Sequence, residues 1–419
     1  MGFIQLGEIS RSLLYPFGMC ITCIINIITE SLLSSLEFKD LEGETITFSK
    51  HLFFLVWVWL MFLGESSNII IYIIQRLRTP NKDTQHYHKK LKVNRTGILP
   101  RKDKCTVVLI IIILFILDTS TSFTLFVTRQ TSYLSKGELL LKLLSTFFTS
   151  ILTIVVLKYK YYKHHILGFI IVSVALISMT IMEVVIYKLK GNDIFFSSEL
   201  VILFLTYLFS SVQEVYEKYL IDIKFVNPFA LIAFEGFGGL FTTSCLLVVF
   251  YNVRCVSGVI CEENAPKTED FIKTWQIISK NPRLIILVSI LYISITFFNS
   301  FRILTNQHYT PTHRSLSDSI ASFIAWILKL TIPFLNQTTT KDDVFYIQNI
   351  IMGVLYIIMI IGVLIFLEII ILTFCDLDRN TKEKINARQE FFGINNTILP
   401  VTDNEGSEEE KSQDNSTLY

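Results

Sequence analysis

Ten apolar runs, most of them about 20 residues long, constrain this chain more than any other feature of its sequence. They fall near residues 12–33, 51–75, 105–128, 138–158, 166–189, 199–222, 229–251, 283–304, 313–335 and 346–374. A helix of about 20 apolar residues is long enough to cross the hydrocarbon core of a bilayer. Apolar residues make up 51% of the chain and charged residues 17%, a balance that soluble domains seldom have. We therefore predict an all-α polytopic membrane protein with ten transmembrane helices.

The stretch Tyr309–Trp326 (YTPTHRSLSDSIASFIAW) is unusual because it opens one of these apolar runs and yet carries charge. Its polar residues follow helical spacing, which places them on a single helix face. They are Ser315, Asp318, Ser319 and Ser322. Because an ionised group at the bilayer centre costs about 2.5–3.5 kcal/mol even on lenient scales, this face is predicted to point at protein or at a watery cavity.

A similar face occurs earlier in the chain, where Tyr133–Lys142 aligns without a gap on Tyr309–Asp318. The same spacing then continues through Ser145, Thr146 and Thr149. Two halves of five spans each must insert in opposite orientations, which is the inverted-repeat plan of secondary transporters. Chance similarity between apolar helices is the alternative. We predict a first repeat at 1–190, a second at 191–374 and a cytosolic, disordered tail at 375–419, whose end is acidic.

The charge of the loops predicts the orientation. Basic segments at 75–104, 158–163 and 379–388 favour the cytosolic side, so both termini are expected there. Loops 34–50, 252–282 and 336–345 then lie on the lumenal or exterior side. Asn336 begins a glycosylation sequon in one of them, and Cys255 and Cys261 are disulfide candidates in another. The sequon has a chance explanation as well, because the pattern recurs in segments expected to be cytosolic.

Polar residues recur on several other predicted spans and indicate a common interior cavity. The candidates for substrate binding and coupling are Asn26, Glu65, Asp118, Lys142, Glu214, Glu235, Asn299, Arg314 and Asp318. For the charged ones, a structural ion pair between helices is an equal alternative. A second group of charges lies near the expected helix ends, where long side chains reach the membrane interface. That group comprises Glu30, Glu183, Glu217, Lys218, Lys329 and Glu368.

The motifs that the chain lacks exclude several functions. It has no GxxxxGK[ST] loop, no HExxH and no GxSxG, so neither ATP-driven transport nor an enzyme is expected. The pairs His86/His88 and His164/His165 have no companions at metal-ligand spacing, so we expect no metal and no cofactor. A net charge of +1 gives no reason to expect a nucleic-acid partner.

Several ordered segments resemble the drug/metabolite transporter superfamily, in its nucleotide-sugar-transporter-like branch (solute carrier family 35, F-type). The segments lie within about residues 12–372, and the 213–239 stretch is the most specific. They are MFLGE at 61–65, ILDTSTSFTLF at 116–126, QEVYEKYLIDIKFVNPFALIAFEGFGG at 213–239 and NSFRILTNQHYTPTHRSLSDSIASFIAW at 299–326. The resemblance implies ten spans in two inverted five-helix repeats and alternating access. One departure is Lys142, which stands where relatives tend to have arginine and so lacks the bidentate fork of a guanidinium.

These observations together predict a secondary active transporter of a small polar organic solute, nucleotide-sugar-like or another metabolite. A proton or a counter-solute would drive it, and the lipid bilayer of an endomembrane (Golgi, ER or a lysosome-like organelle) would be its location. The acids at 65, 118, 235 and 318 are the expected coupling groups, while Lys142 and Arg314 are expected to contact an anionic substrate. A non-transporting membrane receptor or scaffold of the same fold is the alternative.

Overall fold

The computed structural model describes residues 4–6, 14–39, 45–47, 54–78, 101–130, 138–159, 161–189, 198–254, 267–331, 343–373, 377 and 381. Helices dominate this part of the chain, and the description of the fold that follows is confined to it. The helices are α1 (Leu14–Ser35), α2 (Phe54–Ser66), α3 (Asn68–Arg78), α5 (Arg101–Gln130), α6 (Glu138–Leu157), α7 (Lys163–Leu189), α8 (Ser198–Asp222), α9 (Pro228–Asn252), α10 (Phe271–Lys280), α11 (Pro282–His308), α12 (Pro311–Thr331) and α13 (Asp343–Phe366).

Six stretches of these helices are long and apolar enough to cross a membrane, which agrees with a multi-pass integral membrane protein. They are Trp57–Leu77, Cys105–Thr124, Lys163–Met182, Pro228–Asn252, Pro282–His308 and Gln348–Phe366. Shorter apolar stretches, Leu14–Glu30 and Leu144–Leu157, lie in α1 and α6. Each of the ten predicted apolar runs contains helix, although the run 51–75 is divided between α2 and α3. Ten membrane crossings and the inverted repeat remain predictions.

The start of α9 illustrates how the sequence sets a helix boundary. Asn227 is its N-cap, and its side-chain oxygen accepts hydrogen bonds from the backbone N–H groups of Phe229 and Ala230, at 3.0 and 3.2 Å. Pro228 follows in the first helical position, where a missing N–H costs nothing. The asparagine and the proline together begin the helix that carries Glu235.

Two features of the fold differ from the sequence-based expectation. The predicted loop 252–282 contains a further helix, α10, which is capped by the side chain of Asp270. The predicted last span, 346–374, ends early, because α13 stops at Phe366. Beyond it, Ile370–Leu372 forms β4, which pairs antiparallel with β1 (Ile4–Leu6). A second small sheet joins β2 (Glu37–Lys39) to β3 (Thr45–Thr47).

The turn between α13 and β4 is a Schellman motif. The N–H of Ile369 donates to the carbonyl of Leu364 at 3.0 Å, and the N–H of Glu368 donates to that of Ile365 at 3.1 Å. Glu368 occupies the left-handed position of this motif, with φ of 58°. Glycine is the usual residue there, because a Cβ atom makes this conformation unfavourable.

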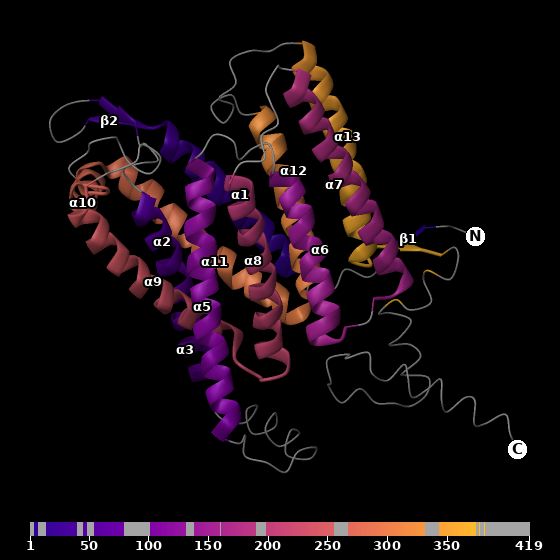
Figure 1. The fold of residues 1–419 in the computed structure, drawn as a ribbon, viewed down its shortest axis with the longest axis horizontal. Helices are drawn as coiled ribbons and strands as arrows, with labels where there is room; N and C mark the ends of the chain where they lie inside the picture. Colours follow the sequence, from indigo (N-terminus) through magenta and orange to yellow (C-terminus); the bar gives the residue numbers. More distant parts are fainter. Residues whose placement is uncertain are drawn as a thin grey trace, which may run out of the picture.

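The helices run broadly alongside one another as a bundle (Figure 1). At one side α7 packs along α13, and their apolar side chains form a core around Met179, Met359 and Val363. On the other side α2 approaches α9 so closely that a Cβ added at Gly236 would lie 2.4 Å from the backbone nitrogen of Ser66. The glycines of α9 therefore allow a close helix–helix contact, as small residues do in membrane proteins.

The N-terminal helix is placed among helices from the far end of the chain. The hydroxyl of Ser294, on α11, donates to the backbone carbonyl of Thr22, on α1, at 2.9 Å. Cys20 of α1 likewise contacts the carbonyl of Ser317 of α12 through its sulfur, at 3.7 Å. Consequently α1 packs against α11 and α12.

Several predictions concern residues outside the described ranges. The disulfide candidates Cys255 and Cys261, the sequon residue Asn336 and most of the predicted tail belong to this group. Lys142 lies in α6, but its side chain is not described.

Candidate functional site

A cluster of buried charged residues lies between the helices, and we call it the central charge cluster. Its carboxyls come from α2, α5, α8 and α9, and its two guanidiniums come from α11 and α12. The members are Glu65, Asp118, Glu214, Glu217, Glu235, Arg302 and Arg314. Among the described residues, this is where most of the buried acids in apolar helices gather. Charges so far from water need partners, because burial in a low-dielectric interior is costly.

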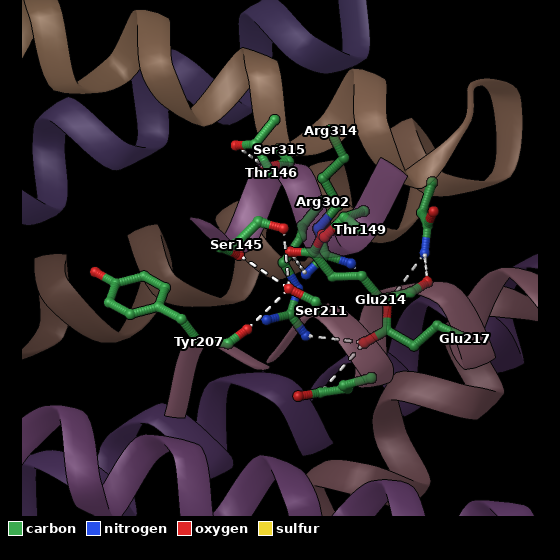
Figure 2. Close-up of polar contacts among 12 residues, drawn as sticks. Ser145, Thr146, Thr149, Tyr207, Ser211, Glu214, Glu217, Arg302, Arg314 and Ser315 are labelled. Carbon is green, nitrogen blue, oxygen red and sulfur yellow. Dashed lines mark hydrogen bonds and ion pairs between the residues drawn. The ribbon is translucent and has the colours of Figure 1, made fainter. Parts of the chain in front are cut away.

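Arg314 holds the shortest ion pair of the cluster. One of its terminal nitrogens (Nη1) lies 2.7 Å from Oε2 of Glu217, and the other (Nη2) lies 3.5 Å from Oε1 of Glu214. Figure 2 shows Glu214 and Glu217, one turn apart on α8, in the same cluster as Arg314. Glu217 is completely buried and Arg314 is 4% exposed. This arrangement ties α12 to α8 through charge-assisted hydrogen bonding.

Glu217 is also the best-supported carboxylate of the cluster. Its Oε1 accepts a hydrogen bond from the amide of Gln213 at 3.2 Å, and its Oε2 accepts one from the amide of Asn306 at 3.3 Å. The same amide of Asn306 also donates to the backbone carbonyl of Glu214 at 3.0 Å. Glu217 is thereby fixed in position by residues of both α8 and α11.

Arg302 makes longer contacts with two helices. Its Nη2 lies 3.7 Å from Oε1 of Glu65 on α2 and 3.7 Å from Oε1 of Glu217 on α8. Asp118 and Glu235 also interact electrostatically with this guanidinium. The guanidinium of Arg302 therefore interacts with four carboxyls. Its ion pairs with Glu65 and Glu217 are both longer than the pair between Arg314 and Glu217.

The acids outnumber the bases in this cluster. Five carboxyls face two guanidiniums among the described side chains, which leaves an excess of three. In the described part of the structure, both carboxyl oxygens of Glu65 and of Glu235 are buried without a hydrogen-bond partner, as is Oδ2 of Asp118. Buried polar atoms are rarely left in this state, because each one costs about 1–3 kcal/mol. The carboxyls of Glu65, Asp118 and Glu235 can therefore accept a proton, a cation or a ligand.

A seam of hydroxyl groups borders the cluster where α6 meets α8 and α12 (Figure 2). Thr146 and Ser315 share a hydrogen bond of 2.8 Å, and the hydroxyl of Ser211 donates to the carbonyl of Ser145 at 3.0 Å. The hydroxyl of Thr149 lies 3.5 Å from Oε2 of Glu214. The two similar polar faces found in the sequence thus point at protein, as predicted, and they also contact each other through Thr146 and Ser315.

The structure brings most of the predicted site residues towards this interior. Glu65, Asp118, Glu214, Glu235 and Arg314 belong to the cluster itself. Asn299 is buried on α11, and Asn26 is half-buried on α1 with its Oδ1 atom lacking a partner among the described residues.

Asp318 is half-buried one turn after Arg314 and interacts electrostatically with Glu214, at the edge of the cluster. Lys142 lies three residues before Ser145 on α6, and its side chain is outside the described part. The expected contact between Lys142 and an anionic substrate therefore stays a prediction.

Two members of the cluster were assigned wrongly or missed by sequence reasoning. Glu217 was expected at the membrane interface, but it is fully buried and paired with Arg314. Lys218 was expected there too, yet it is buried and paired with Asp222 at 3.0 Å. Arg302 was not considered. Helical spacing places Glu217 and Arg302 on the same faces as predicted site residues. Glu217 follows Glu214 by three residues, and Arg302 follows Asn299 by three.

Comparisons with known proteins add little to this picture. No protein-family model matches the chain, and no curated protein matches it in sequence. A solved structure described only as "Crystal structure of protein" superimposes on it with a TM-score of 0.48 and 11% sequence identity, over 85% of this chain and 97% of that one. A similarity at this level carries no argument about fold or function, so the functional argument depends on the site itself.

Proposed function

We propose that this protein is a secondary active transporter that moves a small polar organic solute across an endomembrane, coupled to a proton or a counter-solute. The observation that carries the proposal is the excess of buried carboxyls in the central charge cluster. Ionisable residues within apolar spans commonly mark substrate or ion pathways. The resemblance to the drug/metabolite transporter superfamily supports the same function, with ten spans, two inverted repeats and alternating access.

The two parts of the cluster have different roles in this proposal. Glu217 is held by Arg314 and by two amides, so it forms the fixed scaffold of the site. Glu65, Asp118 and Glu235 have carboxyl oxygens that lack hydrogen bonds among the described residues, and they are the coupling groups. A proton or a cation that binds to them offsets the excess negative charge, and its release to the other side completes the cycle. Arg314 is engaged by two glutamates, so an anionic substrate would have to compete with them.

Proteoliposomes that contain the purified protein and a trapped pH-sensitive dye test the proposal. Nucleotide sugars, amino acids and small peptides are added outside in turn, and both solute uptake and the internal pH are followed. We expect one solute class to enter and to change the internal pH.

The Glu235→Gln variant should lose the coupled pH change and keep its fold, because both oxygens of Glu235 lack hydrogen bonds in the described structure. The matched control is Asp270→Asn, a carboxyl outside the cluster that should leave transport unchanged. The coupling role of Glu235 would be contradicted if solute uptake depended neither on the ion gradient nor on the Glu235→Gln substitution. The absence of flux for every solute from a stably folded protein would favour the receptor or scaffold function instead.

A further inference from the structure

Figure 1 shows that α7 begins at the end of the bundle where α13 ends. A second group of polar side chains lies there. His164 and His165 occupy the first turn of α7, and Glu368 follows α13. Nε2 of His164 lies 2.9 Å from Oε1 of Glu368, and Nε2 of His165 lies 3.9 Å from the same oxygen. The two imidazole rings lie 4.0 Å apart, centroid to centroid. Three potential metal ligands thus meet from chain segments about 200 residues apart in sequence (204 between His164 and Glu368).

We propose that His164, His165 and Glu368 form a binding site for a divalent transition metal ion, with zinc the best match. One potential ligand atom from each residue lies within 4.8 Å of the other two. Around a tetrahedral zinc ion with bonds of about 2.0–2.1 Å, neighbouring ligand atoms lie about 3.3 Å apart. Closing the site around an ion therefore requires side-chain movements on the order of 1 Å and no change of the helices.

The chemistry of the ligands selects the kind of metal. Two imidazoles and one carboxylate are typical of zinc sites that keep a fourth position for water or another ligand. Calcium and magnesium prefer oxygen ligands and more of them, so they fit this group poorly. The His313 ring lies 5.8 Å from that of His165, but its Nδ1 atom is already hydrogen-bonded to the hydroxyl of Thr310 at 2.6 Å, so we do not include it among the ligands.

The side chain of His164 is held inside the protein at this site. This residue is 4% exposed, and Nε2 is the ring nitrogen that lies 2.9 Å from Oε1 of Glu368. An ion bound through Nε2 would replace this contact by a bond to the metal, which is the usual role of a neutral imidazole nitrogen. The other ring nitrogen, Nδ1, has no hydrogen-bond partner among the described residues and would not change on metal binding.

The backbone at Glu368 adds to this observation. A glutamate stands in the left-handed position of the Schellman turn, where glycine would be more stable. Strained positions of this kind concentrate at functional sites. At this position the glutamate brings a carboxylate beside two imidazoles, whereas a glycine would have no side chain to contribute.

A zinc ion at this position would fasten the start of α7 to the segment that joins α13 to β4. The site is separate from the central charge cluster and does not depend on the proposed transport function. Its expected effect is a stabilised helix pair, because an ion that binds only the folded protein raises the free energy of unfolding.

The test uses the purified full-length protein in detergent micelles after treatment with a chelator. Zinc ions are titrated against a coloured competing chelator, and cobalt ions are added to record the visible absorption of a tetrahedral site. The thermal unfolding midpoint is measured with and without zinc. The wild type should bind one zinc ion that His164, His165 and Glu368 hold, give the cobalt spectrum and unfold at a higher temperature with zinc.

Two variants decide whether the ion occupies the proposed site. Glu368→Gln keeps the shape of the side chain, and His165→Ala keeps the contact between His164 and Glu368. Loss of even an outer-shell residue costs about 10–100-fold in metal affinity, so each variant should lose at least about tenfold. The control is the double variant His86→Ala/His88→Ala in the basic loop, which should bind like the wild type. Wild-type affinity in both site variants, or loss of binding in the control, overturns the proposal.

Discussion

Replacement of Arg314 by methionine should destabilise the folded protein by about 3–5 kcal/mol. The substitution removes the guanidinium that lies 2.7 Å from Glu217 and 3.5 Å from Glu214 and leaves both glutamates buried. Breaking a buried ion pair by removing one partner costs about 3–5 kcal/mol, since the remaining charge is left uncompensated. Coulomb's law gives a similar value, about 4 kcal/mol for unit charges 4 Å apart at an effective dielectric constant of 20.

The double variant Arg314→Met/Glu217→Gln should be more stable than Arg314→Met alone. It neutralises the carboxylate that loses its shortest ion pair in the single variant and keeps only the 3.7 Å contact with Arg302, so the two substitutions should couple by about 1–3 kcal/mol. The glutamine introduced at position 217 would still contact the amides of Gln213 and Asn306, whose positions are set by α8 and α11.

Unfolding in mixed micelles with increasing denaturing detergent, followed by tryptophan fluorescence, measures these differences. Lys267→Met is a suitable control because the Lys267–Asp270 pair is partly exposed, with side chains 31% and 28% accessible, and it should unfold almost as the wild type does. The reasoning is refuted if Arg314→Met costs less than about 1 kcal/mol. A double variant no more stable than Arg314→Met would refute it as well.

Three further predictions concern other parts of the structure. Gly236→Ala should cost about 1–3 kcal/mol through overpacking, since the new Cβ would lie 2.4 Å from the backbone nitrogen of Ser66, whereas at Gly353 the nearest atom is 3.2 Å away on a side chain. Asp318→Asn should abolish solute uptake in proteoliposomes without loss of folded protein. Asp270→Ala should weaken α10 by about 1 kcal/mol through loss of its N-cap, seen as faster amide hydrogen exchange in that helix.

Each of these has a result that would contradict it. Equal thermal midpoints for Gly236→Ala and Gly353→Ala would show that α2 and α9 separate at little cost. Full uptake by the Asp318→Asn variant would contradict the coupling role that the sequence analysis expects for Asp318, without affecting the roles proposed for Glu65, Asp118 and Glu235. The Asp270→Asn variant retains the capping oxygen but loses the ion pair with Lys267. If amide exchange in α10 is as fast in this variant as in Asp270→Ala, the ion pair and not the cap stabilises the helix.

The polar faces were predictable from the sequence because helical periodicity and the cost of charge in lipid act locally. Thr146 and Ser315 turn inward for that reason, although their contact with each other also requires that α6 and α12 be neighbours. The charged partner of a residue such as Glu217 cannot be predicted in this way, because it depends on which helices become neighbours. Proximity to a helix end suggested the interface for Glu217, but α11 and α12 cover that end of α8 with Asn306 and Arg314.

The histidine pair shows the same limit more clearly. Spacing along the chain gave His164 and His165 no third ligand, and hydropathy carried the last apolar run through Glu368 to residue 374. The structure ends α13 at Phe366, and the following turn brings Glu368 to the histidines. Neither periodicity nor composition contains that information, because it arises from the packing of α7 against α13.

The position of α1 among helices from the far end of the chain also determines the order of events during synthesis. The hydrogen bond between Thr22 and Ser294 joins residues 272 positions apart. At about 5–20 residues per second, a ribosome needs roughly 15–55 s to produce the second after the first. During that interval the backbone carbonyl of Thr22 lacks the hydroxyl on α11 that later donates to it. A chain that terminates before α11 would leave α1 permanently without that neighbour, so α1 cannot reach its final packing until most of the chain has been made.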